Sequence, residues 1–140
     1  MKVFIDASLI VYLNIRLPEA MARLVEDFYR KLLTEELYTD VLALDEAIYV
    51  STRRYRVSLR DSLELVDRAV LPYVEILPLG ASEYVKAKRY MVEYGLKPSD
   101  AIHLAAIDNG GVQAIATEDR DFDRTHVRRI WVNLYAGEGI

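Results

Sequence analysis

Five carboxylates stand where a fold could gather them into one site: Asp6, Glu46, Asp100, Asp119 and Asp121. Asp6 ends a short apolar run, Asp119 and Asp121 follow another, and Asp100 opens an apolar helical segment. Two carboxylates 4 Å apart repel by about 1 kcal/mol in water and about 4 kcal/mol at an effective dielectric of 20. Converging carboxylates therefore raise one another's pKa unless a cation binds between them. Such a cluster predicts a metal site.

The available ligand types indicate which metal this would be. The chain has no cysteine and only two histidines, so its ligands would be almost entirely carboxylate oxygens. Oxygen ligands favour the hard cations Mg²⁺ and Mn²⁺ over zinc. Magnesium keeps several coordination positions open, which suits a phosphate oxygen and a water nucleophile. The predicted chemistry is hydrolysis at phosphorus.

Strands and helices alternate along the sequence. Apolar and β-branched runs predict strands at residues 2–7, 37–39, 74–79, 112–116 and 129–133. Helical spacing of apolar residues predicts helices at residues 8–16, 19–36, 41–55, 58–71, 81–94 and 99–109, followed by a tail at 134–140. This order predicts an α/β fold with a mainly parallel sheet and helices on both of its faces.

The carboxyl ends of such strands form the ligand-binding edge of the sheet. Asp6, Asp119 and Asp121 fall there, and Asp100 joins them because its helix leads directly into the strand before Asp119. Glu46 interrupts the apolar stripe of helix 41–55, where an ionised carboxylate is costly unless a cation or strong donors meet it.

Three nearby residues have simpler expected roles. Thr39 or Asp40 is available to cap helix 41–55. His103 lies among apolar residues of helix 99–109, which predicts a core or interface histidine whose hydrogen bonds are satisfied, rather than a ligand.

Each acid also has a structural interpretation when it is taken alone. Asp100 could be a first-turn acid worth at most about 1 kcal/mol through the helix dipole. Asp119 and Asp121 could be ordinary turn residues. Asp6 is harder to explain in this way because it directly follows a buried strand. The occurrence of all five acids at these positions of one fold is what favours a metal site.

Length and composition limit the remaining possibilities. With 140 residues and 52% hydrophobic content, we expect one compact domain spanning residues 1–140. No signal peptide or membrane span is apparent, which predicts a soluble, cytoplasmic protein. The net charge of −4 argues against a nucleic-acid partner, but without the five site acids 17 acidic residues face 18 basic ones, a balance of +1.

The motifs FIDAS, LDEAIYV, SDAIHLAAI and TEDRDF, in this order and spacing, resemble the four acidic motifs of PIN-domain ribonucleases, especially VapC-like toxins. The resemblance spans nearly the whole chain; Asp45 directly before Glu46 departs from it. It implies a three-layer α/β/α sandwich and Mg²⁺- or Mn²⁺-dependent endonucleolytic cleavage of RNA. It also implies a homodimer and inhibition by a small DNA-binding antitoxin whose tail fills the groove.

The resemblance also implies residue roles. Four acidic positions fall on Asp6, Glu46, Asp100 and Asp119, an additional one on Asp121, and hydroxyl positions beside the metal on Ser8 and Thr117. The resulting hypothesis is that Asp6, Asp100 and Asp119 hold one or two divalent ions, with Glu46 and Asp121 acting directly or through water. The ions would activate a water for in-line attack on phosphorus.

Substrate contact and two alternative functions stay open. As a group, Arg53, Arg54 and Arg120 could flank an RNA groove, although each alone is an ordinary surface charge. One alternative is a phosphoacceptor or phosphatase-like domain that uses Asp6, which is disfavoured because no second acid follows Asp6 at once and no lysine follows Asp100. The other is a noncatalytic binding module that keeps the fold.

Overall fold

A single parallel sheet organises the protein. The computed structural model describes residues 1–132, within which five strands follow the order β3-β2-β1-β4-β5. The strands are β1 (Lys2–Ile5), β2 (Glu36–Thr39), β3 (Val74–Ile76), β4 (Ala114–Ala116) and β5 (Arg128–Ile130). β1 lies at the centre between β2 and β4, and every pairing is parallel. The predicted mainly parallel sheet is confirmed.

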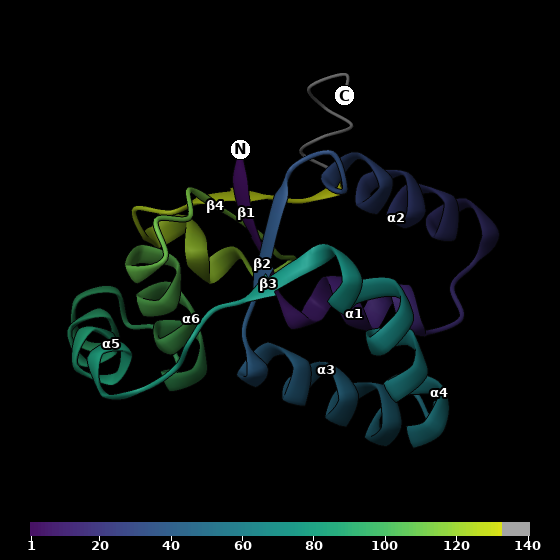
Figure 1. Ribbon diagram of the computed structural model, residues 1–140, viewed down its shortest axis with the longest axis horizontal. Coiled ribbons are helices and arrows are strands. Elements are labelled where there is room, and N and C mark those ends of the chain that lie inside the picture. The colour runs from purple at the N-terminus through teal and green to yellow at the C-terminus, as the bar shows by residue number, and fades with distance from the viewer. Residues whose placement is uncertain (133–140) are drawn as a thin grey trace.

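Helices cover both faces of this sheet. They are α1 (Ala7–Asn14), α2 (Glu19–Leu32), α3 (Val41–Arg53), α4 (Leu59–Leu65), α5 (Ala81–Tyr94) and α6 (Pro98–Asn109). In Figure 1, α5 and α6 lie on one side of the sheet, and α1, α2 and α4 lie on the other. The predicted three-layer α/β/α architecture is confirmed. Within residues 1–132, no helix combines the length and the apolar character that crossing a membrane requires.

The alternation of side chains along β1 explains why both faces need a cover. Val3 and Ile5 pack into the core beneath α1 and α2, whereas Phe4 points to the opposite core beneath α6. All three are fully buried. Burying a side chain of this size contributes roughly 1.5–3 kcal/mol, so the central strand is stabilised from both sides.

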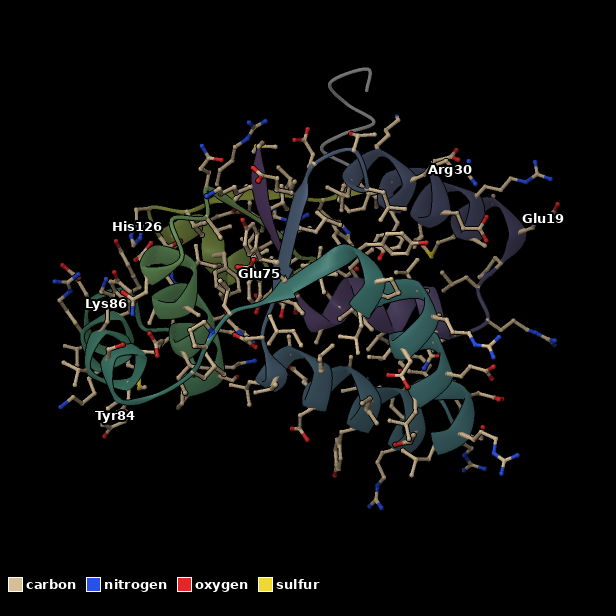
Figure 2. The ribbon with its side chains drawn as sticks, viewed as in Figure 1. Glu19, Arg30, Glu75, Tyr84, Lys86 and His126 are labelled. Atoms are coloured by element: carbon tan, nitrogen blue, oxygen red, sulfur yellow. The ribbon has the colours of Figure 1, made fainter. Side chains whose placement is uncertain are left out.

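The amphipathic pattern of α2 determines how it packs. Val25, Phe28 and Leu32 are buried against the sheet. Glu19 and Arg30 point away from it, as Figure 2 shows. Residues three and four apart share one face of a helix, so this apolar stripe docks α2 as predicted.

Two element ends differ from the prediction because backbone pairing extends or stops there. The helix predicted to reach residue 36 ends at Leu32, and Glu36 begins β2, its N–H donating to the Met1 carbonyl at 3.1 Å. The strand predicted over residues 74–79 ends at Ile76, and the pairing with β2 stops after the Leu77 N–H, which donates to the Thr39 carbonyl at 2.8 Å.

Other strand ends are set by their neighbours. β1 ends at Ile5, not at residue 7, because the next residue caps α1. β4 begins at Ala114 rather than at residue 112, and it pairs with β5 over Arg128–Ile130 rather than residues 129–133. Position 133 and the predicted tail at 134–140 lie outside the described residues.

The helix predicted over residues 58–71 changes its hydrogen bonding partway. α4 ends at Leu65, and the chain continues as a π-helical turn, Val66–Val70, and a 3-10 turn, Leu71–Tyr73. The hydroxyl of Tyr29 donates to the Ala69 carbonyl at 2.6 Å, which satisfies a group inside the widened turn.

Candidate metal centre

A cavity at the carboxyl edge of the sheet holds four of the predicted acids. It has a volume of about 440 Å³, and its lining includes Asp6, Glu46, Asp100 and Asp119. Asp6 follows β1, Asp119 lies three residues after β4, and Asp100 sits in the first turn of α6. Glu46 reaches the cavity from α3, while the neighbouring Asp45 lines a separate one. The register of α3 therefore directs Glu46, not Asp45, to this site.

Asp6 is held by hydrogen bonds on both carboxylate oxygens. Its Oδ1 accepts from the Ala7 N–H at 2.8 Å, which caps α1, and its Oδ2 accepts from Thr117 Oγ1 at 2.7 Å. Asp6 is 6% exposed and Thr117 is fully buried. Donors on both oxygens fix the orientation of this carboxylate.

The two predicted hydroxyls connect the ends of β1 and β4. Thr117 Oγ1, besides donating to Asp6, accepts from the Asp119 N–H at 3.1 Å. Ser8 Oγ lies 3.4 Å from Thr117 Oγ1 and accepts from the Glu118 N–H at 3.2 Å. Both side chains therefore position the backbone and the acids of the site.

Two groups of three side chains could each hold a cation. In the first, the β1 group, ligand atoms of Asp6, Glu46 and His103 lie within 4.8 Å of one another. In the second, the β4 group, the same holds for Asp100, Asp119 and Asp121. The predicted acids are thus divided between two neighbouring groups, and one group includes a histidine.

Asp121 is the least accessible member of the β4 group for a ligand in the cavity. A 3-10 helix, Arg120–Arg124, follows Asp119, whose Oδ1 accepts from the Asp121 N–H at 2.9 Å and caps it. Asp121 Oδ1 accepts from Arg124 Nη1 at 3.0 Å, and Asp121 is not part of the cavity lining. An arginine therefore already neutralises part of its charge.

Electrostatic repulsion among the acids appears in their pKa values. Burial, and next the charges of Asp6 and Asp119, raise the pKa of Asp100 to about 7. Burial and Asp6 also raise the pKa of Glu46, while His103 and Lys97 act in the opposite direction. A carboxyl that resists ionisation beside other carboxylates marks a position where a bound cation would be stabilised.

His103 lies on α6 behind this cavity. It is fully buried, its Nδ1 lies 2.7 Å from Asp40 Oδ2, and its Nε2 lies 3.7 Å from Asp6 Oδ1. Burial lowers the pKa of His103, but hydrogen bonding to Asp40 and the charges of Asp6, Asp40 and Asp100 outweigh it, so the net shift is upward. Nε2 has no hydrogen-bond partner.

The sequence interpretation did not assign Asp40 and His103 to the site. Asp40 does cap α3, since its Oδ1 accepts from the Ala43 N–H at 2.8 Å, but its second oxygen reaches His103. His103 was expected to be a core histidine with satisfied hydrogen bonds, and only one of its nitrogens is satisfied. Two signals were available. Asp40 directly follows a strand as Asp6 does, and His103 lies one helical turn after Asp100.

Positive and aromatic side chains surround the acids. Arg54 and Arg120 line the cavity as predicted for the arginine group, and Lys97 joins them without having been predicted. Arg53 does not line it; its guanidinium stacks on Tyr49, 5.7 Å from the ring centre. Two tyrosines, Tyr12 and Tyr55, also contribute to the lining.

These donors fit a divalent cation. Carboxylate oxygens predominate, which suits Mg²⁺ or Mn²⁺. The raised pKa of Asp100 and the unpartnered Nε2 of His103 are both unfavourable features that a nearby cation would relieve.

Known structures share this architecture. VapC20 from Mycobacterium tuberculosis, described as a sarcin-ricin loop cleaving toxin, is 18% identical with a TM-score of 0.70, covering 90% of this chain and 98% of its own. DNA-bound VapBC from Salmonella typhimurium is 14% identical with a TM-score of 0.70, and the match covers 94% of this chain and 98% of the other. PAE2754 from Pyrobaculum aerophilum is 20% identical with a TM-score of 0.67, and the match covers 99% of this chain and 94% of the other.

Two sequence comparisons complete the assignment. A search of curated protein sequences finds no significant match. The model of the PIN domain family, however, matches residues 3–127, which includes every acid of the cavity. The resemblance found from the four motifs is thereby confirmed, and this chain belongs to the PIN domain family.

Proposed function

We propose that this protein is a Mg²⁺- or Mn²⁺-dependent endoribonuclease, the toxin of a toxin-antitoxin pair. The observation that carries the proposal is the convergence of Asp6, Glu46, Asp100 and Asp119 from four separate elements on one cavity. Membership of the PIN domain family and the fold shared with VapC20, itself described as a sarcin-ricin loop cleaving toxin, support the same activity.

Each residue has a proposed task. When bound, the metal supplies activation of a water nucleophile and neutralisation of charge on the phosphate. Asp6, Asp100 and Asp119 bind the metal, and Asp121 supports Asp119 through the hydrogen bond that orders the 3-10 turn. Glu46 is more exposed than Asp6, Asp100 and Asp119, and its raised pKa suits a group that accepts a proton from the attacking water.

The residues around the acids suit a single-stranded polyanion. Arg54, Lys97 and Arg120 supply positive charge for phosphates on either side of the cleaved bond. Tyr12 and Tyr55 offer ring faces on which an unpaired base stacks. Single-stranded or looped RNA is therefore the proposed substrate class.

Cleavage assays test this function directly. Purified protein should cleave RNA in the presence of Mg²⁺ or Mn²⁺, and a chelator should abolish cleavage. The variants Asp6→Asn and Asp100→Asn should be inactive. Glu46→Gln should also be strongly impaired, whereas Asp45→Asn, the exposed neighbour on the same helix, should retain activity. Full cleavage in a chelator or in both aspartate variants contradicts the proposal.

Two outcomes would favour the alternative functions. Mn²⁺ binding without cleavage would favour a noncatalytic module, and stable phosphorylation of Asp6 would favour the phosphoacceptor alternative.

Adjacent arginines provide a matched test of RNA contact. Arg54→Ala should weaken RNA binding and reduce the slope of affinity against salt by about one unit, because one phosphate contact is lost. Arg53→Ala is the control, since Arg53 stacks on Tyr49 outside the cavity. Equal salt slopes for both variants would exclude Arg54 as a phosphate contact.

Exposed apolar side chains support the proposed protein partners. Val85 and Val92 lie two turns apart on α5 and are 62% and 89% exposed, which suits a homodimer surface. Met21 and Leu24 on α2 border an apolar hollow that adjoins the cavity at Tyr12 and Glu118, which suits part of an antitoxin tail that fills the groove. Sedimentation of Val92→Glu and copurification with a coexpressed antitoxin test the two interfaces separately.

A further inference from the structure

The tautomer of His103 follows from its surroundings. Asp40 Oδ1 accepts a backbone N–H, and Oδ2 lies 2.7 Å from His103 Nδ1. A carboxylate in this position is an acceptor, so Nδ1 carries the hydrogen and donates to Asp40. In the neutral ring, Nε2 then carries the lone pair, and the nearby carboxylates of Asp6, Asp40 and Asp100 favour the form in which a proton or a metal ion is bound there.

This lone pair faces another acceptor. Nε2 lies 3.7 Å from Asp6 Oδ1 and has no hydrogen-bond partner, although it is fully buried. Without a bound proton or metal ion, two acceptors would face each other here, which is unfavourable. Asp6, Asp40 and Asp100 all act electrostatically on the ring, so the space between Nε2 and Asp6 attracts positive charge.

The spacing of the atoms suits a metal ion. Metal bonds of about 2.1 Å place two ligand atoms about 3.0 Å apart at a right angle and about 4.2 Å apart when they are opposite. The separation of 3.7 Å falls between these limits, and a carboxylate oxygen of Glu46 completes a set within 4.8 Å. The carboxylate of Asp40 behind the ring is the arrangement that orients metal-binding histidines.

We propose that the β1 group is a distinct cation position in which His103 Nε2 is a nitrogen ligand beside Asp6, with the Glu46 carboxylate next to it as the proposed proton acceptor. Asp100 and Asp119 of the β4 group then form the neighbouring, all-oxygen position, and Asp40 is a positioning residue that orients His103. This assignment deepens the proposed nuclease function, on which it rests. A nitrogen ligand shifts the preference of the β1 group from Mg²⁺ toward Mn²⁺.

Electron spin echo spectroscopy of the full chain with Mn²⁺ tests this ligand without measuring activity. Wild-type protein should show nitrogen coupling to Mn²⁺ that changes when histidine is supplied with ¹⁵N in its imidazole ring. The sequence has two histidines, and the second, His126, is exposed. His126→Gln should keep the coupling and His103→Gln should lose it. If His103→Gln does not fold, the labelled wild type and His126→Gln still identify the nitrogen.

Calorimetry adds an independent measurement. In His103→Gln the affinity for Mn²⁺ should fall by about 10- to 100-fold, the affinity for Mg²⁺ should fall less, and His126→Gln should match the wild type. Bound Mn²⁺ without imidazole coupling, or coupling that persists in His103→Gln, overturns the histidine ligand and leaves a metal-dependent nuclease intact. Absence of Mn²⁺ binding, or cleavage in a chelator, overturns the proposed function as well.

Discussion

The β1 group and the β4 group contain the same type of acid but differ in what holds it. Asp6 in the β1 group accepts from two donors, Ala7 N–H and Thr117 Oγ1, in a nearly buried setting. Asp121 in the β4 group accepts from Arg124, whose side chain is half exposed. Asp100 mainly experiences burial and the charges of its neighbours. The β1 end of the site is thus fixed by hydrogen bonds of the fold, whereas the β4 end leaves Asp100 exposed to the repulsion of neighbouring carboxylates.

The largest expected effect separates the two groups by activity. Asp6→Asn should reduce RNA cleavage by about 1,000-fold or more, because it removes a fixed ligand. Asp121→Asn should stay within about tenfold of the wild type, since Arg124 already occupies one of its oxygens. Initial rates at saturating Mn²⁺ measure both, with thermal melts confirming folding. Equal losses would place Asp121 among the direct ligands.

The next effect concerns stability behind the β1 group. Asp40→Ala should lower the free energy of unfolding by about 3 kcal/mol, because it removes a helix cap and leaves His103 Nδ1 buried without a partner. Chemical denaturation measures the loss. Asp45→Ala, an exposed change on the same helix, should stay within about 0.5 kcal/mol. A loss at Asp40 as small as that at Asp45 would mean that the pair does not stabilise the fold.

A smaller effect is expected at the link between the groups. Thr117→Val should cost about 1–2 kcal/mol of stability, because the Asp6 carboxylate and the Asp119 N–H both lose their partner. It should also weaken Mn²⁺ binding by about tenfold. Thr117→Ser keeps the hydroxyl and should restore both, as denaturation and calorimetry would show. Failure of Thr117→Ser to restore metal binding would indicate that the methyl group, not the hydroxyl, matters.

The smallest effect is a pH dependence from the β4 group. The pKa of Asp100 is about 7 in the folded, metal-free protein and has its ordinary lower value in the unfolded chain. The folded state therefore binds the extra proton, and this contribution to stability is lost as the pH rises through about 7. From pH 6 to pH 8 the melting temperature of the metal-free wild type should therefore fall more than that of Asp100→Asn. If the difference in melting temperature between the two proteins were the same at both pH values, the raised pKa of Asp100 would be contradicted.

Sequence reasoning placed acids well where the strand pattern was strong. Asp6 and Asp119 followed from apolar strands whose carboxyl ends must share an edge, and Asp100 followed from the helix that leads into β4. The Asp40–His103 pair could not be derived in this way, because its partners are 63 positions apart and meet only when α3 and α6 pack. The orientations of Arg53 and Arg54 at the end of α3 likewise depend on which side of the helix faces the cavity.

The hydrogen bond between Thr117 and Asp6 joins residues 111 positions apart, one directly after the central strand β1 and one directly after β4. During synthesis Thr117 therefore emerges long after Asp6. Because such long-range parallel pairing forms late, the carboxylates cannot gather at one edge before β4 has been made. Translation products that end before β4 would therefore lack the assembled cavity.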